Sequence, residues 1–217
     1  MDYAILAGGP PAHLPDLKKP PFENVQWLGA DRGTYRLLEH GIRPVKAFGD
    51  FDSIDERERH LIGKMALNLD VFPTEKDQTD LEIAVDWALK QEPRRCWIVG
   101  ATGGRLDHTL INVQFLIKGA SISTEVLLID KQNIVTLLTP GVYNIEKTPA
   151  FPYVSLIAFT THITGITLDG FKYPLKNAEL SRGSSLCVSN EIVREQATIR
   201  IGSGEVLLIR SRDERYS

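Results

Sequence analysis

The sequence lacks the features that mark secreted and membrane-spanning proteins. It has only two cysteines, Cys96 and Cys187, and they do not form a CxxC pair, so we expect two buried, reduced thiols rather than a disulfide or a zinc site. No apolar run approaches the roughly 20 residues that a membrane span needs. The first residues lack the basic segment of a signal peptide, and we therefore expect a cytoplasmic protein.

An excess of basic charge is also lacking. Lys and Arg number 25 against 28 Asp and Glu, a net charge of −3, so we expect no binding to DNA or RNA. With 217 residues, 42% of them apolar, the chain can bury the core of one large domain or two small ones. The acidic residues cluster locally, and such clusters suit a cation better than a polyanion.

The first part of the chain alternates short apolar runs with helical patterns. Apolar runs at 3–7, 25–28, 45–48, 69–72, 96–99 and 126–129 have the length and composition of strands buried on both faces of a parallel sheet. Helices are expected over 34–40, 55–67, 79–91 and 105–118. The third should begin with a capping box at Thr79 and Glu82, and the fourth carries Leu106, Leu110, Val113 and Ile117 on one face.

The pattern changes to a period of two at about residue 139. Short strands are expected at 154–159, 163–168, 175–180, 197–201 and 206–209, with glycine turns between them. We therefore expect two domains. Residues 1–138 should form an α/β domain with a wound, mostly parallel sheet and helices on both faces, and residues 139–217 an antiparallel β-sandwich.

Acidic residues follow successive strands of the predicted parallel sheet, where such sheets bind ligands. Asp31 follows the second strand, Asp50 and Asp52 the third, Asp77 and Asp80 the fourth, and Asp107 the fifth. Like charges brought together repel unless a cation lies among them, and Mg²⁺ takes carboxylate, water and phosphate oxygens as ligands. Asp50 and Asp52 could instead cap the helix expected at 55–67, and Asp77 could cap the helix expected at 79–91.

Two of these loops also carry groups suited to phosphate. Lys76 offers a positive charge beside Asp77 and Gln78. The segment 100–105 is neither a Walker loop nor GxGxxG, but its paired glycines stand just before a helix, where backbone N–H groups can approach a phosphate, and Arg105 adds a bidentate donor.

Taken together, the motifs resemble those of bacterial thiamine pyrophosphokinases. The similar segments are GDFDS at 49–53, KDQTDLE at 76–82, GATGGRLDH at 100–108 and SNE at 189–191. The resemblance implies an α/β domain followed by a β-sandwich, a homodimer with active sites at the subunit interface, and diphosphate transfer from ATP to thiamine that yields AMP.

By position, the resemblance also implies roles for individual residues. Asp50, Asp52 and Asp80 correspond to Mg²⁺ ligands. The groups that would contact ATP are Asp31, Lys76, Gln78, Thr102 and Arg105. Asp77 and Arg105 would act on the reacting phosphates, and Asp77 or Asp107 would accept the proton of the thiamine hydroxyl. Ser189 and Asn190 correspond to the loop that contacts thiamine.

Two other function classes fit parts of the pattern. Asp50-x-Asp52-Ser53 resembles the nucleophile loop of haloacid-dehalogenase-type phosphatases, although that loop normally follows the first strand. A non-catalytic carrier of thiamine or a nucleotide would use the β-sandwich for binding and would leave the acidic edge without a role.

Overall fold

The computed structural model describes residues 1–49, 69–71 and 77–214, and it divides into two compact units, Met1–Lys131 and Gln132–Ser217. The predicted helix at 55–67 lies outside the described residues. The units separate ahead of the predicted boundary at residue 139, because the strand Asn133–Leu138 pairs along its length with the strand Val206–Ser211 of the second unit.

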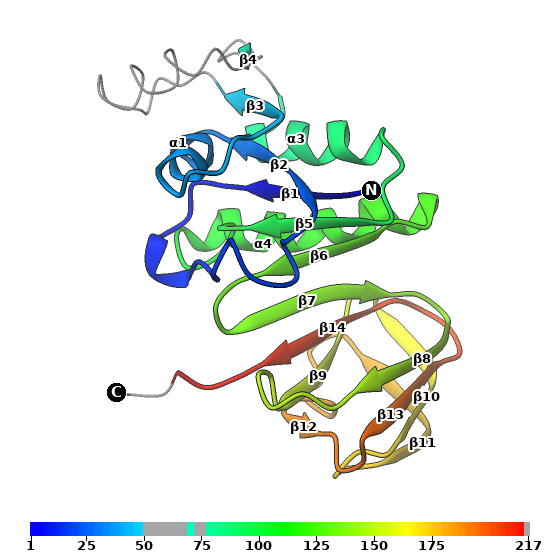
Figure 1. Cartoon of the computed structure of the whole chain (residues 1–217). Helices are drawn as coiled ribbons and strands as arrows, with labels where there is room; N and C mark the ends of the chain where they lie inside the picture. Colours follow the sequence, from blue (N-terminus) through cyan, green and yellow to red (C-terminus); the bar gives the residue numbers. More distant parts are fainter. Residues whose placement is uncertain (50–68, 72–76, 215–217) are drawn as a thin grey trace. The chain divides into compact units, whose positions relative to one another are not determined.

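The first unit is built on a parallel sheet (Figure 1). Its strands are β1 (Asp2–Leu6), β2 (Val25–Ala30), β3 (Lys46–Gly49), β4 (Leu69–Val71), β5 (Arg95–Val99) and β6 (Glu125–Ile129). They lie in the order β6-β5-β1-β2-β3-β4, and every neighbouring pair is parallel. The described strands of this unit therefore confirm the parallel sheet that the apolar runs predicted.

Helices cover both faces of this sheet (Figure 1). They are α1 (Arg32–Glu39), α3 (Asp80–Leu89) and α4 (Leu106–Gln114). Two 3₁₀ helices are also present: η1 (Pro11–His13) lies between β1 and β2, and η2 (Phe115–Ile122) follows α4. The chain moves from β2 to β3 through α1 and returns across the sheet through α3 and α4. Because such crossovers are right-handed, α1 lies on one face and α3 and α4 lie on the other.

The start of α3 shows how local sequence sets an element. The Thr79 hydroxyl accepts a hydrogen bond from the backbone N–H of Glu82 at 3.2 Å, so the cap expected at this position is present and the helix begins at Asp80. The Glu82 carboxylate instead accepts a bond from Lys118 Nζ at 2.9 Å, which ties α3 to η2.

The apolar face of the fourth helix is not part of the core of its own unit. Leu106 is 70% exposed and Leu110 is 59% exposed, and Ile117 in η2 is also on the surface. The one buried residue of α4 is the polar Asn112. An exposed stripe of this kind usually marks a surface that another molecule covers.

The second unit consists of two antiparallel sheets. One has the strands β7 (Asn133–Leu138), β9 (Tyr153–Ala158), β12 (Asn190–Glu191) and β14 (Val206–Ser211) in the order β12-β9-β14-β7. The other has β8 (Gly141–Glu146), β10 (His162–Asp169), β11 (Leu175–Ser181) and β13 (Gln196–Ile201) in the order β11-β10-β13-β8. Alternate residues of both sheets, among them Leu156, Ile166 and Ile199, form one apolar core, as in a β-sandwich.

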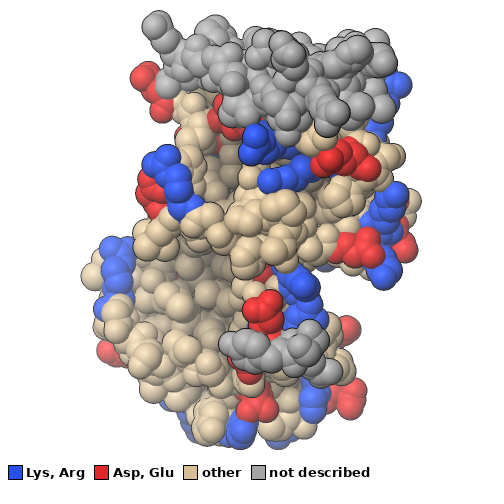
Figure 2. All heavy atoms as spheres, turned by 90° about the vertical axis from the view of Figure 1, so that its left-hand side faces the viewer, with Lys and Arg blue, Asp and Glu red and all other residues tan. Residues whose placement is uncertain are grey.

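Both cysteines are buried, as expected, and no disulfide joins them. Burial raises the pKa of the Cys96 thiol to about 12, so this group is inert at neutral pH. Within the described part of the chain, no helix has the length and apolar character needed to cross a membrane. On the face drawn in Figure 2, acidic and basic side chains are interspersed.

The contact between α1 and β1 depends on Gly33. A Cβ at this position would lie 1.8 Å from the carbonyl oxygen of Leu6, which is backbone that cannot move aside cheaply. We expect Gly33→Ala to lower the free energy of unfolding by about 2–3 kcal/mol through this clash. Urea unfolding measures the change. Gly104→Ala is the control, because its Cβ would meet only Pro10 Cδ at 3.7 Å. Equal stability of the two variants would contradict the packing described for α1.

Candidate active site

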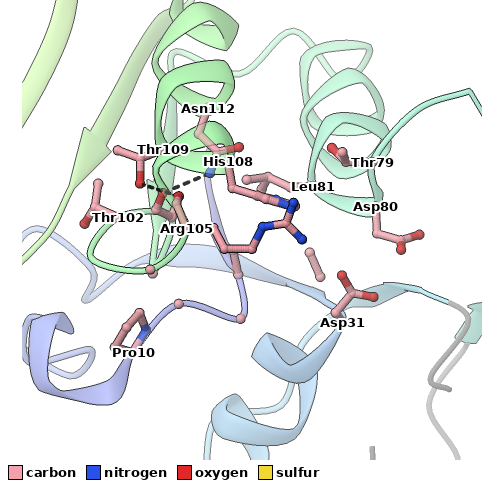
Figure 3. Close-up of a pocket in the computed structure, with 17 residues that line it drawn as sticks. Pro10, Asp31, Thr79, Asp80, Leu81, Thr102, Arg105, His108, Thr109 and Asn112 are labelled. Atoms are coloured by element: carbon pink, nitrogen blue, oxygen red, sulfur yellow. Dashed lines mark hydrogen bonds between the residues drawn. The ribbon is translucent and has the colours of Figure 1, made fainter. Parts of the chain in front are cut away.

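A pocket of about 420 Å³ opens at the carboxyl ends of the central strands of the first unit (Figure 3). Its walls come from segments that directly follow β1, β2 and β5 and from the first turns of α3 and α4. Residues far apart in sequence therefore meet here because parallel strands all point their carboxyl ends to one edge. Of the predicted site residues, the pocket brings together Asp31, Asp80, Thr102 and Arg105.

Asp31 lies between β2 and α1 in a backbone conformation (φ 50°) that few residues other than glycine adopt. Its N–H donates to the carbonyl of Phe48 at 2.8 Å, which holds it against the end of β3. A Cβ on Gly49 would lie 2.8 Å from Asp31 Oδ1. The carboxylate of Asp31 is therefore beside the residue that precedes Asp50.

Asp80 is the first residue of α3 and lines the same pocket (Figure 3). The partial positive charge at the N-terminus of a helix attracts anionic groups to this position. Its neighbours in the predicted motif lie differently. Asp77 and Gln78 are exposed and do not line the pocket, and the Gln78 amide donates to Asp86 Oδ2 at 3.2 Å.

Arg105 and Asp107 form an ion pair at the start of α4. The guanidinium donates to both carboxylate oxygens, from Nε at 3.1 Å and from Nη2 at 2.5 Å. Hydrogen bonds from Arg105, and next from the His108 N–H, lower the pKa of Asp107 to about 2. Arg105 lines the pocket, whereas Asp107 is exposed outside it.

The glycine-rich loop between β5 and α4 forms one wall of the pocket. Its Gly100 carbonyl accepts a bond from the Gly9 N–H at 2.7 Å, and the Asn112 amide donates to the Ala101 carbonyl at 2.9 Å. Gly103 has φ +79°, and a Cβ there would lie 2.4 Å from the His13 ring, so only glycine fits. This wall is thus packed against the segment that follows β1.

Two contributors to this wall were not predicted from the sequence. Asp130, which is 5% exposed, accepts a hydrogen bond from the Thr102 hydroxyl at 2.7 Å, and Asn112 is 6% exposed. Asp130 directly follows β6, so the rule that placed the other acids at strand ends could have found it. Asn112 lies within a helical pattern, and nothing in the sequence around it distinguishes it.

Comparison with known proteins identifies the family. The family model of the thiamin pyrophosphokinase catalytic domain matches residues 22–128, and the model of the thiamin pyrophosphokinase vitamin B1 binding domain matches residues 142–206. The chain belongs to the thiamin pyrophosphokinase family.

Similar proteins extend over nearly all of the chain. A thiamine pyrophosphokinase of Bacillus subtilis is 49% identical over 96% of this chain and 98% of its own length. The crystal structure of thiamine pyrophosphokinase from Bacillus subtilis has a TM-score of 0.94 at 47% identity and covers 99% of this chain and 100% of that chain. The enzyme structure from Geobacillus thermodenitrificans has a TM-score of 0.90 at 44% identity and covers 99% of each chain.

The predicted thiamine-contacting residues lie in the vitamin B1 binding domain of this family member. Ser189 is exposed, has φ 58°, and its N–H donates to Ser155 Oγ at 2.9 Å. Asn190 is buried (4% exposed), and its side chain bonds the N–H and carbonyl of Tyr173, at 3.0 and 2.8 Å, and the N–H of Glu191. The Asn190 amide therefore holds backbone in place, and Ser189 is the exposed member of the pair.

Three of the predicted residues, Asp50, Asp52 and Lys76, lie outside the described residues. Among the residues that the structure does describe, no group of three or more His, Cys, Asp and Glu side chains has the arrangement of a metal site. The described part of the site nevertheless fits a hard cation, because Asp31 and Asp80 present carboxylate oxygens to one pocket and Asp31 adjoins the segment that continues to Asp50.

The ion pair at the start of α4 can be tested by titration. Arg105→Gln should raise the pKa of the Asp107 carboxyl from about 2 toward its ordinary value of 3.8, because the largest cause of the shift is removed. NMR of the Asp107 carboxyl carbon measures it. In the wild type, the stabilisation from this pair is complete above pH 3.8 and is lost as the pH falls toward 2.

The control for this titration is Arg95→Gln, which removes a different arginine–carboxylate contact, with Glu125 at 2.6 Å. This variant should leave the Asp107 titration unchanged. A pKa near 3.8 for Asp107 in the wild type would show that the ion pair does not persist in solution.

Proposed function

We propose that this chain transfers a diphosphate group from ATP to the hydroxyl of thiamine, with Mg²⁺, and that the pocket at the strand ends binds the ATP phosphates. The observation that carries the proposal is the convergence of Asp31, Asp80, Arg105 and the glycine-rich loop on one pocket, in a member of the thiamin pyrophosphokinase family.

The reaction forms a bond between the thiamine hydroxyl oxygen and the β-phosphorus of ATP. The bond between that phosphorus and the oxygen bridging to the α-phosphate breaks, and AMP leaves with this oxygen. The hydroxyl proton passes to a base. Transfers of this kind mostly require positioning and neutralisation of charge.

For the metal, we assign Asp50, Asp52 and Asp80 as ligands. When bound, Mg²⁺ would neutralise phosphate charge and align the polyphosphate. Asp80 contributes a carboxylate from the first turn of α3, and Asp31 holds its own carboxylate against Gly49 at the end of β3. This placement supports the assignment, since a ligand from α3 and a residue beside Gly49 share one pocket.

For ATP, we assign Asp31, Lys76, Gln78, Thr102 and Arg105 as contacts. Arg105 reaches into the pocket from the start of α4, where a guanidinium can pair with phosphate oxygens, and backbone of the glycine-rich loop lines the same wall. The Gln78 amide bonds Asp86 in this structure and must leave it to reach a phosphate.

Two aspartates were expected as alternative proton acceptors, and their surroundings differ. The pKa of Asp107 is about 2 because Arg105 and the His108 N–H bind its ionised form, and this makes it a weak base. Asp77 is exposed just before the cap of α3. We therefore assign proton acceptance to Asp77 and the orientation of Arg105 to Asp107.

For thiamine, we assign the segment of Ser189 and Asn190 in the vitamin B1 binding domain. Ser189 presents the exposed polar group, whereas Asn190 fixes the backbone on either side of it through its bonds to Tyr173 and Glu191. Asn190 then affects thiamine binding by shaping the loop.

We further propose a cytoplasmic homodimer. The buried free thiols suit a reducing compartment. The exposed apolar side chains of α4 and η2, which are Leu106, Leu110, Ile111 and Ile117, would lose contact with water at a subunit interface.

The activity is tested by a mass-resolved product assay with ATP, Mg²⁺ and thiamine. We expect AMP and thiamine diphosphate in equal amounts, and no turnover after chelation of the metal. Orthophosphate with a phosphoaspartate trapped at Asp50 would indicate a phosphatase instead. Tight thiamine binding without metal, ATP or any product would indicate a carrier.

Loss of the Asp80 charge tests the metal assignment. Asp80→Asn should lower kcat/KM by about 100-fold or more, because one charged group that stabilises the transition state is removed. Raised Mg²⁺ should restore part of the rate if the carboxylate binds the ion. Asp16→Asn, which removes an exposed carboxylate of the same unit, is the matched control and should retain full activity. Normal turnover of Asp80→Asn at ordinary Mg²⁺ would contradict the assignment.

The homodimer is tested at α4. Leu110→Glu places a charge on the exposed stripe and should shift the mass in solution from twice 24.2 kDa to 24.2 kDa, as measured by light scattering. Val45→Glu alters another exposed apolar residue, 46% exposed, and should leave the mass unchanged. A wild-type protein that is monomeric at micromolar concentration would rule out the dimer.

A further inference from the structure

The glycine-rich loop that walls the pocket is attached to buried polar side chains behind it. Thr102 Oγ1 donates to Asp130 Oδ2 at 2.7 Å, and Asn112 Nδ2 donates to the Ala101 carbonyl at 2.9 Å (Figure 3 shows Thr102 and Asn112). Asp130 follows β6, the strand next to β5, and Asn112 comes from α4. The loop is thus fixed from the sheet and from the helix that it leads into.

The residue after Asp130 is bonded to the chain segment that packs against the glycine-rich loop. The N–H of the next residue, Lys131, donates to the carbonyl of His13 at 2.8 Å, and the His13 ring packs on Gly103. His13 belongs to the segment that follows β1, which includes the pocket residues Gly9 and Pro10. One short segment after β6 therefore contacts both chain segments that enclose this side of the pocket.

Asp130 lies behind the pocket wall and not in the pocket. It is 5% exposed and does not line the pocket, whereas Thr102 does. A carboxylate removed from water needs hydrogen bonds to offset the loss, and the Thr102 hydroxyl supplies one of them. Because this hydroxyl donates its hydrogen bond to Asp130, it cannot donate to a phosphate while that bond is intact.

We infer that Asp130 is a positioning residue for ATP that acts through the Thr102 hydroxyl and holds the glycine-rich loop in the conformation that binds the phosphates. The inference deepens the proposed function and rests on it. It changes the role of Thr102, whose contribution to ATP binding comes from anchoring the loop backbone.

The inference is tested by steady-state kinetics on Thr102→Val, which keeps the side-chain shape and removes the donor. We expect the KM for ATP to rise about three- to tenfold, the range for loss of one buried hydrogen bond that orders a site, with little change in the KM for thiamine. Thr102→Ser, which restores the hydroxyl, should recover most of the wild-type KM for ATP.

Thr124→Val is the matched control. Thr124 is 6% exposed and donates its hydroxyl to the Pro93 carbonyl at 2.7 Å, just before the amino end of β6 and away from the pocket. Thermal unfolding should show a comparable loss of stability in both valine variants, but only Thr102→Val should change the KM for ATP.

Asp130→Asn, alone and combined with Thr102→Val, tests the hydrogen-bonded pair itself. Asp130→Asn alone also tests the inference if Thr102→Val does not fold. Asn keeps an acceptor oxygen without the charge, so Asp130→Asn should raise the KM for ATP by less than Thr102→Val. The double variant should be no worse than Thr102→Val, because Thr102→Val already removes the contact that Asp130→Asn weakens.

The outcomes separate this inference from the function on which it rests. A wild-type protein that makes no AMP from ATP and thiamine overturns the proposed function. If the wild type is active, two results overturn the role of Asp130 alone. One is an equal KM for ATP in Thr102→Val and Thr124→Val. The other is a double variant whose KM increase is the product of the increases from Thr102→Val and Asp130→Asn.

Discussion

Parallel pairing of β3, β2, β1, β5 and β6 is the constraint on which the site depends, because it delivers the residue after each strand to one edge of the sheet. Asp31, Gly100 and Asp130 each follow a strand of this set. The acidic ones repel each other unless they are separated, paired or bound to a cation. The described acids at this edge differ in their surroundings.

Asp107 is paired with Arg105, and its lowered pKa reflects that pairing. Asp130 is withdrawn behind the pocket wall and accepts a bond from Thr102. Asp31 and Asp80 stay within the pocket, and Asp80 is the first residue of α3. One sheet edge therefore holds carboxylates in three different surroundings: within the pocket, paired with an arginine and buried behind the pocket wall.

Prediction from the sequence reached the fold class and most of the described helices and strands, but it missed the strands β7 (Asn133–Leu138) and β8 (Gly141–Glu146). The correct predictions succeeded because buried parallel strands are apolar throughout and because Thr79 caps a helix in a locally recognisable way. The face of α4 is different. The same apolar spacing that buries one face of α3 leaves Leu106 and Leu110 on the surface, since periodicity identifies an apolar face but not what covers it.

By itself, the sequence determined which residues stand at strand ends, where helices begin, and which family the motifs resemble, because these depend on local pattern and on residue order. Only the tertiary structure decided that Asp107 is bound to Arg105, that the Asn190 amide is occupied by the backbone of Tyr173, and that Asp130 anchors Thr102. The partner of each side chain depends on how the backbone is folded around it. The spacing of polar residues in the sequence does not show which way a polar side chain points.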